Sequence, residues 1–211
     1  DKQLLTGFLL RDFTYINSPP IGRDGKSIYI QGSVEFSGLE ILGLNKLYNA
    51  LSGNNQVWQA WGVEFAQYAR LELDLRRYWR KRQTRTLVAR LNTGVIVPLG
   101  NSEEAPYVKQ FFVGGHQSIR GMYARGIGPG SFLDTTTTDL SQRNFFYQTG
   151  DIKLEWNIEY RFHLFRPLNL FDWNMAFFVD GGNIWTLDED PDADGKREGS
   201  KFEFKNTFKQ M

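Results

Sequence analysis

Ser118 and His116 are the residues whose types could form a nucleophile and its base. Hydrolases of the Gly-x-Ser-x-Gly type place the serine on a sharp turn, and a third polar group orients the histidine. Here the segment reads Gly115-His-Gln-Ser-Ile-Arg120, which lacks that pattern and shows no third group. The chain has no cysteine and one further histidine, His163, so thiolate chemistry and a histidine-rich zinc site are both disfavoured. We therefore predict that the protein is not an enzyme and uses no metal or other cofactor.

An acidic run near the C-terminal end could instead bind calcium. Asp190, Asp192 and Asp194 match the beginning of an EF-hand loop, in which alternate residues supply oxygen ligands. The twelfth position of such a loop carries a bidentate glutamate, but here it is Lys201, which cannot coordinate a cation. We interpret residues 188–195 as an acidic external loop, and whether it also holds calcium stays open.

Composition narrows the class of partner and of membrane segment. The 211 residues include 25 Lys+Arg and 24 Asp+Glu, a formal net charge of +1, so charge gives no reason to expect a nucleic-acid partner. The mean hydropathy is −0.44. Moreover, no apolar run approaches the roughly 18 residues of a spanning helix. A protein that crosses the membrane with strands remains compatible, and aromatic residues make up 15% of the chain.

The elements that must position these side chains are strands, because apolar and polar residues alternate with a period of two. From Asp151 to Leu164 the even-numbered residues are apolar and the odd-numbered residues are polar, without an exception. Similar patterns predict strands at about 4–16, 27–36, 63–76, 84–97, 151–164 and 171–185, and the start of another near 201. Soluble strands usually have about five or six residues, whereas a strand that crosses a bilayer needs roughly 9–11. The length of these strands favours a membrane protein.

The connections between the expected strands alternate in length. Short connections at 77–83 and 165–170 alternate with long ones at 37–62, 98–150 and 186–200. Outer-membrane barrels alternate short periplasmic turns with longer external loops in the same way, and their strands carry polar residues toward a wet lumen. We therefore predict an all-β fold in which residues 1–211 form part of an antiparallel transmembrane β-barrel.

The longest connection contains a glycine-rich motif. Gly114-Gly-x-x-Ser-Ile-Arg-Gly121 is followed by Gly126-x-Gly-Pro-Gly130, and so many glycines predict a tightly turning backbone. Asn157-Ile-Glu-Tyr-Arg161 lies in the next strand, and Phe177-Phe-Val-Asp-Gly-Gly-Asn-Ile-Trp185 in the one after. In this order the motifs resemble those of the BamA/TamA superfamily of outer-membrane assembly and secretion barrels, the bacterial surface antigen family. The Gly-Pro-Gly-Ser ending is most similar to TamL, the TamA-like branch of Bacteroidota.

The resemblance implies a sixteen-stranded barrel in which loop 98–150 folds back into the lumen. It also implies that the motif arginine, Arg120, binds acidic residues of the barrel wall. Met122 stands where the family usually has an aromatic residue, and Tyr123 follows it. The residues that match the loop motif are Gly114, Gly115, Ser118, Ile119, Arg120, Gly121, Tyr123, Gly128, Pro129 and Gly130.

Strand parity identifies two acidic partners for this arginine. Glu159 lies on the polar face of its strand, and Asp180 lies opposite the apolar residues of the next one, although Phe178 shares its row. Both carboxylates would face the lumen, where a guanidinium group can serve two acceptors at once. We expect Arg120 to hold the loop through Glu159 and Asp180 without performing bond chemistry.

The resemblance implies an outer-membrane factor of Gram-negative bacteria that inserts client proteins or translocates cargo. A weak seam between the first and last strands would offer strand edges to a client. The implied partners are outer-membrane lipid, client outer-membrane proteins and periplasmic or lipoprotein accessory subunits, and periplasmic domains would precede the barrel. A passive porin or substrate channel, with the loop as its constriction, is the alternative. The sequence names no client and does not separate assembly from secretion.

Overall fold

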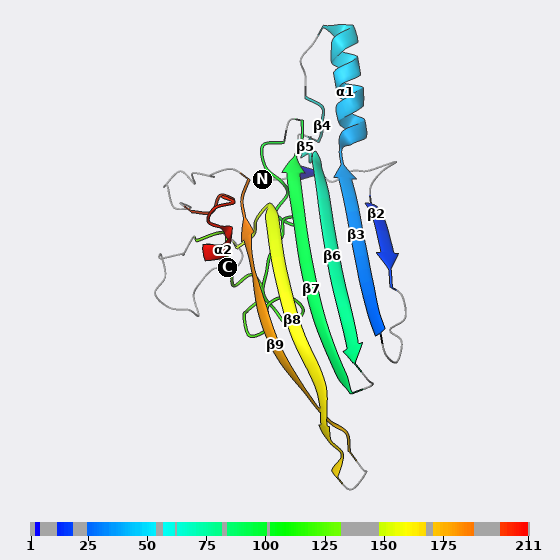
Figure 1. Ribbon diagram of the computed structural model, residues 1–211. Coiled ribbons are helices and arrows are strands. Elements are labelled where there is room, and N and C mark those ends of the chain that lie inside the picture. Colours follow the sequence, from blue (N-terminus) through cyan, green and yellow to red (C-terminus); the bar gives the residue numbers. More distant parts are fainter. Residues whose placement is uncertain are drawn as a thin grey trace.

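A six-stranded antiparallel sheet organises the molecule. The computed structural model describes residues 3–4, 12–18, 25–53, 57–61, 63–81, 84–100, 102–131, 148–167, 171–187 and 199–210. The sheet has the order β2-β3-β6-β7-β8-β9, so each of its strands pairs with the next one along the chain (Figure 1). Its strands are β2 (Asp12–Asn17), β3 (Gly25–Ser37), β6 (Tyr68–Lys81), β7 (Arg85–Pro98), β8 (Ile152–Phe165) and β9 (Trp173–Trp185). The prediction of a mainly antiparallel β fold is confirmed.

The strand expected at residues 63–76 is interrupted. It consists of β5 (Val63–Phe65) and β6, which are separated at Ala66 and Gln67. Gln67 breaks the alternation of the sequence, and its backbone N–H donates to Ser102 Oγ at 2.9 Å instead of joining the sheet. β5 belongs to a second, small sheet with β1 (Gln3–Leu4) and β4 (Gln59–Ala60). The expected strand 4–16 corresponds to β1 and β2, and residues 5–11 between them lie outside the described part.

The segment near residue 201 differs from the expected start of a strand. Lys201 forms an isolated parallel bridge with Thr186, and a turn leads to the short helix α2 (Thr207–Gln210). The segment folds back because the Trp185 indole N–H donates to Gln210 Oε1 at 2.7 Å. Phe202 packs edge-on against the same indole and covers the end of β9, whereas Phe204 is 81% exposed.

Helix α1 (Leu39–Ser52) connects β3 to the small sheet, and glycines in the left-handed conformation stand at both of its ends. Among the described residues, no helix combines the length and apolar character that crossing a membrane requires.

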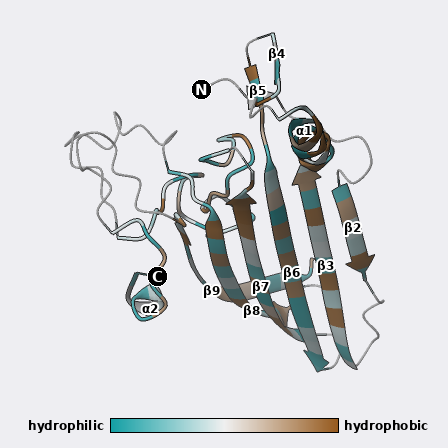
Figure 2. Ribbon diagram, turned by 90° about the horizontal axis from the view of Figure 1, so that it is seen from above, coloured by the Kyte–Doolittle hydropathy of each residue, from teal (hydrophilic) through white to brown (hydrophobic). Residues whose placement is uncertain are grey.

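The six-stranded sheet exposes its apolar face and buries its polar face. On the apolar face, Leu71, Ile158 and Phe177 are 49%, 47% and 64% exposed. On the polar face, Asp74 and Glu155 are 6% and 2% exposed. Soluble proteins show the opposite distribution, and a large exposed apolar surface marks contact with lipid or with another protein. Figure 2 shows the resulting brown and teal bands along the strands.

Residues 102–131 of the long connection cover the polar face at one end of β6–β9. The packed core between this loop and the sheet consists of Ala66, Tyr68, Ile96, Ala105, Phe111, Val113, Ile119 and Ile184. The Phe111 ring lies directly on Gly94 of β7, where a Cβ atom would be 2.4 Å from the ring. The Arg70 guanidinium lies 4.3 Å from the centroid of the same ring. A glycine is therefore required at position 94 if the loop is to reach the sheet.

We predict that Gly94→Ala destabilises the folded protein by about 1–3 kcal/mol, because the added methyl group displaces the Phe111 ring. The midpoint of urea unfolding in lipid measures this change. Gly43→Ala is the matched control, since a Cβ at Gly43 in α1 meets nothing within 4 Å and alanine favours a helix over glycine. Equal midpoints for the two variants would contradict the packing of the loop on β7.

Candidate functional site

Arg120 of the loop binds two carboxylates of the sheet. Its Nε and Nη2 donate to the two oxygens of Asp180, each at 2.7 Å, and its Nη1 donates to Glu159 Oε2 at 2.7 Å. The Arg120 backbone N–H also donates to Asp180 Oδ2 at 3.1 Å. The Asp180 side chain is 3% exposed, and those of Glu159 and Arg120 are 16% and 27% exposed. The structure thus brings together the three residues that the sequence pattern selected.

The register between β8 and β9 places the two carboxylates. Asn157 pairs with Asp180, and Glu159 pairs with Phe178, so the two acids are diagonal neighbours on the polar face. The Phe178 ring, which interrupts the alternation of β9, lies under the Arg120 guanidinium at 3.7 Å from its centroid. Stacking on an aromatic face stabilises a cation, so this aromatic residue belongs to the site.

The electrostatics of the cluster keep Arg120 charged. Its hydrogen bonds to Asp180, and secondly to Glu159, raise the pKa of the Arg120 guanidinium above its usual value, against the effect of burial. Arg161 of β8 binds the other oxygen of Glu159. A planar fork that fills three carboxylate lone pairs holds a loop in one orientation. This arrangement positions backbone and side chains, and among the described residues no group of His, Cys, Asp and Glu could hold a metal ion.

Two glycines of the motif allow backbone to approach backbone or side chain. Gly114 has φ of +102°, and a Cβ there would be 2.0 Å from the Tyr123 carbonyl oxygen. Gly128 has φ of +80°, and a Cβ there would be 2.5 Å from Asn183 Oδ1. Asn183 in turn donates to the Gly130 carbonyl oxygen at 2.9 Å, so β9 holds the end of the motif as well as its arginine.

The remaining motif residues divide between the core and the surface. Ile119 and Pro129 are buried. Gly115 and Gly121 have left-handed backbone conformations. The side chain of Tyr123 is 78% exposed. Residues 188–195, the acidic run, lie outside the described part of the chain.

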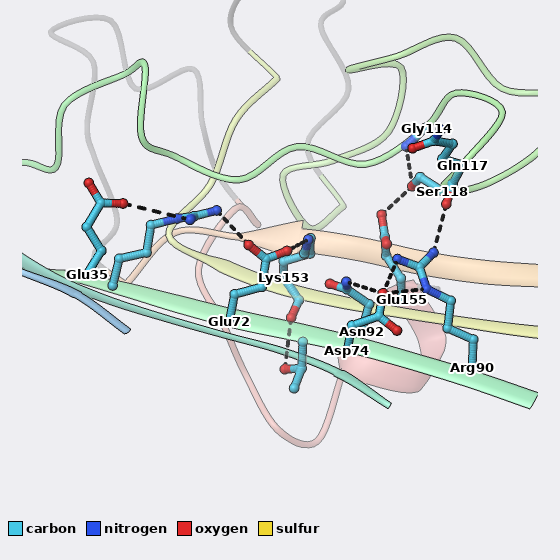
Figure 3. A network of polar contacts seen from close by, with 12 residues as sticks. Glu35, Glu72, Asp74, Arg90, Asn92, Gly114, Gln117, Ser118, Lys153 and Glu155 are labelled. Carbon is cyan, nitrogen blue, oxygen red and sulfur yellow. Dashed lines mark hydrogen bonds and ion pairs between the residues drawn. The ribbon is translucent and has the colours of Figure 1, made fainter. Parts of the chain in front are cut away.

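Ser118 makes a second set of contacts, which the sequence did not indicate (Figure 3). Its hydroxyl accepts a hydrogen bond from the Gly114 backbone N–H at 2.9 Å and donates to Glu155 of β8. Asn157 Nδ2 donates to the Ser118 carbonyl oxygen at 2.8 Å. The serine is therefore a structural residue of the turn, and His116, the base of the nucleophile hypothesis, is exposed.

Arg90 of β7 supports the same turn. Its Nη1 donates to the Gln117 carbonyl oxygen at 2.7 Å, while Nη2 donates to Asp74 of β6 at 2.7 Å. Asn92 also donates to Asp74, at 3.3 Å. Residues 117–120 are thus bound by side chains of β7, β8 and β9, and Asp74 of β6 holds Arg90 in place. Glu155 and Asn157 have odd numbers like Glu159, and this alternation is the sequence signal that places them on the polar face of β8.

An antiparallel sheet that exposes its apolar face and anchors a long loop on its polar face is suited to meet lipid with its strands. The domain model described as the Omp85 superfamily domain matches residues 42–207. The chain therefore belongs to the Omp85 superfamily. This membership supports the resemblance to the BamA/TamA superfamily and indicates a role in outer-membrane protein assembly or translocation. A comparison with curated proteins gave no match.

We predict that Ser118→Ala lowers the free energy of unfolding by about 1–3 kcal/mol, because it leaves the Gly114 N–H and the buried Glu155 without their shared partner. Hydrogen exchange should accelerate at the amides of residues 114–120. Ser52→Ala is the control, because the Ser52 hydroxyl is exposed and, among the described residues, bonds to Tyr48 of its own helix. A surface change of this kind stays within about 0.5 kcal/mol. Equal exchange in the two variants would show that the hydroxyl does not hold the turn.

Proposed function

We propose that this chain is the loop-bearing wall of an outer-membrane barrel of the TamL type in Bacteroidota, and that the complete protein inserts or translocates client outer-membrane proteins. The observation that carries this proposal is the Arg120 contact with Glu159 and Asp180, because it fixes a long loop on the polar face of a sheet whose apolar face is exposed. In a sixteen-stranded barrel the polar face is the lumen wall, and residues 98–150 fill part of the lumen.

The anchored loop braces one side of the barrel. Arg90 connects it to β7 and also binds Asp74 of β6, and Glu159 and Asp180 connect it to β8 and β9. Separation of any two of these strands would break charge-assisted hydrogen bonds, which are about twice as strong as neutral ones. We therefore expect the barrel to open between other strands. In this family, those are the first and last strands, which form a weak seam.

The work of such a protein is strand exchange, without bond chemistry, nucleotide or cofactor. An open edge in lipid leaves N–H and C=O groups unpaired, each at a cost of several kcal/mol. A client strand that pairs with this edge recovers the loss, as in other cases of strand addition. The partners of the proposed function are outer-membrane lipid, client proteins and periplasmic or lipoprotein accessory subunits.

Arg120→Ala tests the anchor. We expect the complete protein to lose stability near the lower end of the about 3–5 kcal/mol that removal of one member of a buried pair costs, because Asp180 stays buried while Arg120 and Glu159 are partly exposed. Heat resistance of the folded barrel in gel electrophoresis measures the loss, and the amount of folded client protein in the outer membrane measures the function. Arg120→Lys keeps the charge without the fork and should give an intermediate result.

Arg125→Ala is the matched control. Arg125 lies in the same loop, but it contacts the rings of Tyr107 and Phe112. Among the described residues, its loss leaves no carboxylate without a partner. Wild-type stability and client assembly in Arg120→Ala would overturn the anchor. Single-channel conductance distinguishes the proposed assembly factor from a passive channel. A large, steady, ion-selective current that survives Arg120→Ala would favour a pore.

A further inference from the structure

Four basic side chains lie on the apolar face, at the end of the sheet where β6 and β7 are joined by a short turn. They are Lys26 of β3, Arg77 and Lys81 of β6, and Arg85 of β7, and all four are exposed. We call these residues the basic rim. Arg77 and Lys81 have the parity of Leu71 and Leu75, which places them on the apolar face. The register places Lys26 opposite Trp79, and Lys81 opposite Arg85.

The basic rim lacks counter-charges within the described residues. The ion pairs of β3, β6, β7 and β8 join polar-face residues, such as Arg90 with Asp74 and Lys153 with Glu72, and none includes a residue of the rim. Lys81 and Arg85 are direct cross-strand partners, and like charges in that position destabilise a sheet. An anion from outside the described chain would therefore stabilise this end of the sheet.

Aromatic rings lie among the basic residues. Arg77 stacks on Trp79 at 5.2 Å from the ring centroid. In the same cross-strand rows, Tyr160 and Phe162 of β8 and Phe177 of β9 continue the surface, and the three rings stack on one another. Amphipathic rings beside basic side chains are typical of the level at which a membrane changes from acyl chain to headgroup.

The rim is one-sided. One row further into the apolar face, Arg77 is followed by Leu75 and its partners Ile30, Leu91 and Trp156. At the opposite end, the row of Phe36, Ala69 and Val97 contains no basic residue. The cations therefore occupy three consecutive cross-strand rows at one end of the sheet, beyond a continuous apolar surface. Long stems let such side chains keep their charge at the polar boundary.

We propose that the basic rim binds the phosphate headgroups of anionic phospholipids in the bilayer leaflet at the short-turn end of the barrel. The inference rests on the proposed function in one respect, that the apolar face meets lipid. Neighbouring strands are about 4.8 Å apart, so the basic side chains of β3, β6 and β7 form one compact patch at the end of the sheet, which can meet several headgroups. Each basic residue near an anionic membrane surface raises affinity roughly fivefold.

Spin-labelled lipids in vesicles that contain the complete protein test the proposal. The vesicles consist of phosphatidylcholine, with a trace of spin-labelled phosphatidylglycerol or phosphatidylcholine, and the fraction of label immobilised by the protein is measured. We expect the wild-type protein to prefer phosphatidylglycerol by about fivefold or more, and the preference should fall at high salt because salt screens surface charges. The triple variant Arg77→Gln, Lys81→Gln, Arg85→Gln should bind both lipids almost equally.

The matched control removes the same charge elsewhere, through Lys46→Gln, Lys201→Gln and Lys205→Gln, at exposed residues of α1 and the C-terminal segment. It should keep the preference for phosphatidylglycerol. If both triple variants lose the preference, or if neither does, the rim is not the lipid site. A wild-type protein without any preference would also overturn the proposal, and this result is expected if the rim binds an acidic protein instead. Failure of the wild-type protein to immobilise either lipid would instead overturn the proposed membrane function.

Discussion

The contact on which the rest of the structure depends is the fork between Arg120 and the carboxylates of Glu159 and Asp180. A sheet whose polar face is buried would normally be unstable, because every charge removed from water loses its hydration. The loop resolves this cost, since it supplies one guanidinium and several backbone groups at the positions where the sheet presents acceptors and donors. The long connection is thus part of the fold and not an appendage to it.

The same constraint explains the glycines. A loop that must bring residues 117–120 to β7, β8 and β9 has to lie close to the sheet, and side chains at Gly94 or Gly128 would hold it away. The contact energy then depends on backbone geometry, because Arg120 uses its own N–H as well as its side chain to bind Asp180. Ser118 serves that geometry by closing the turn from Gly114 and fastening it to Glu155.

The alternation of residues predicted much of the fold and the face on which each side chain lies. It located Glu159 and Asp180, and the single interruption in each of two strands had a physical cause: Gln67 leaves the sheet, and Phe178 stacks under Arg120. Parity does not give the path of a loop, so the partners of Ser118 and Gln117 were not predictable. The segment near Lys201 differs from the expected start of a strand, because Phe202 packs against the Trp185 indole and a turn follows.

The two faces of the sheet meet different solvents, and their chemistry follows from that difference. On the polar face, cations are paired with carboxylates at close distance, since the loop excludes water from part of that surface. On the apolar face, the basic rim has no such partners among the described residues and stands only at one end, next to aromatic rings. Unpaired cations are tolerated where their long side chains bring the charge to a polar boundary, and an anionic headgroup layer is a boundary that complements their charge. The near-zero net charge of the chain therefore hides a difference between the two faces. Charges on the polar face neutralise one another, whereas the basic rim of the apolar face directs positive charge outward.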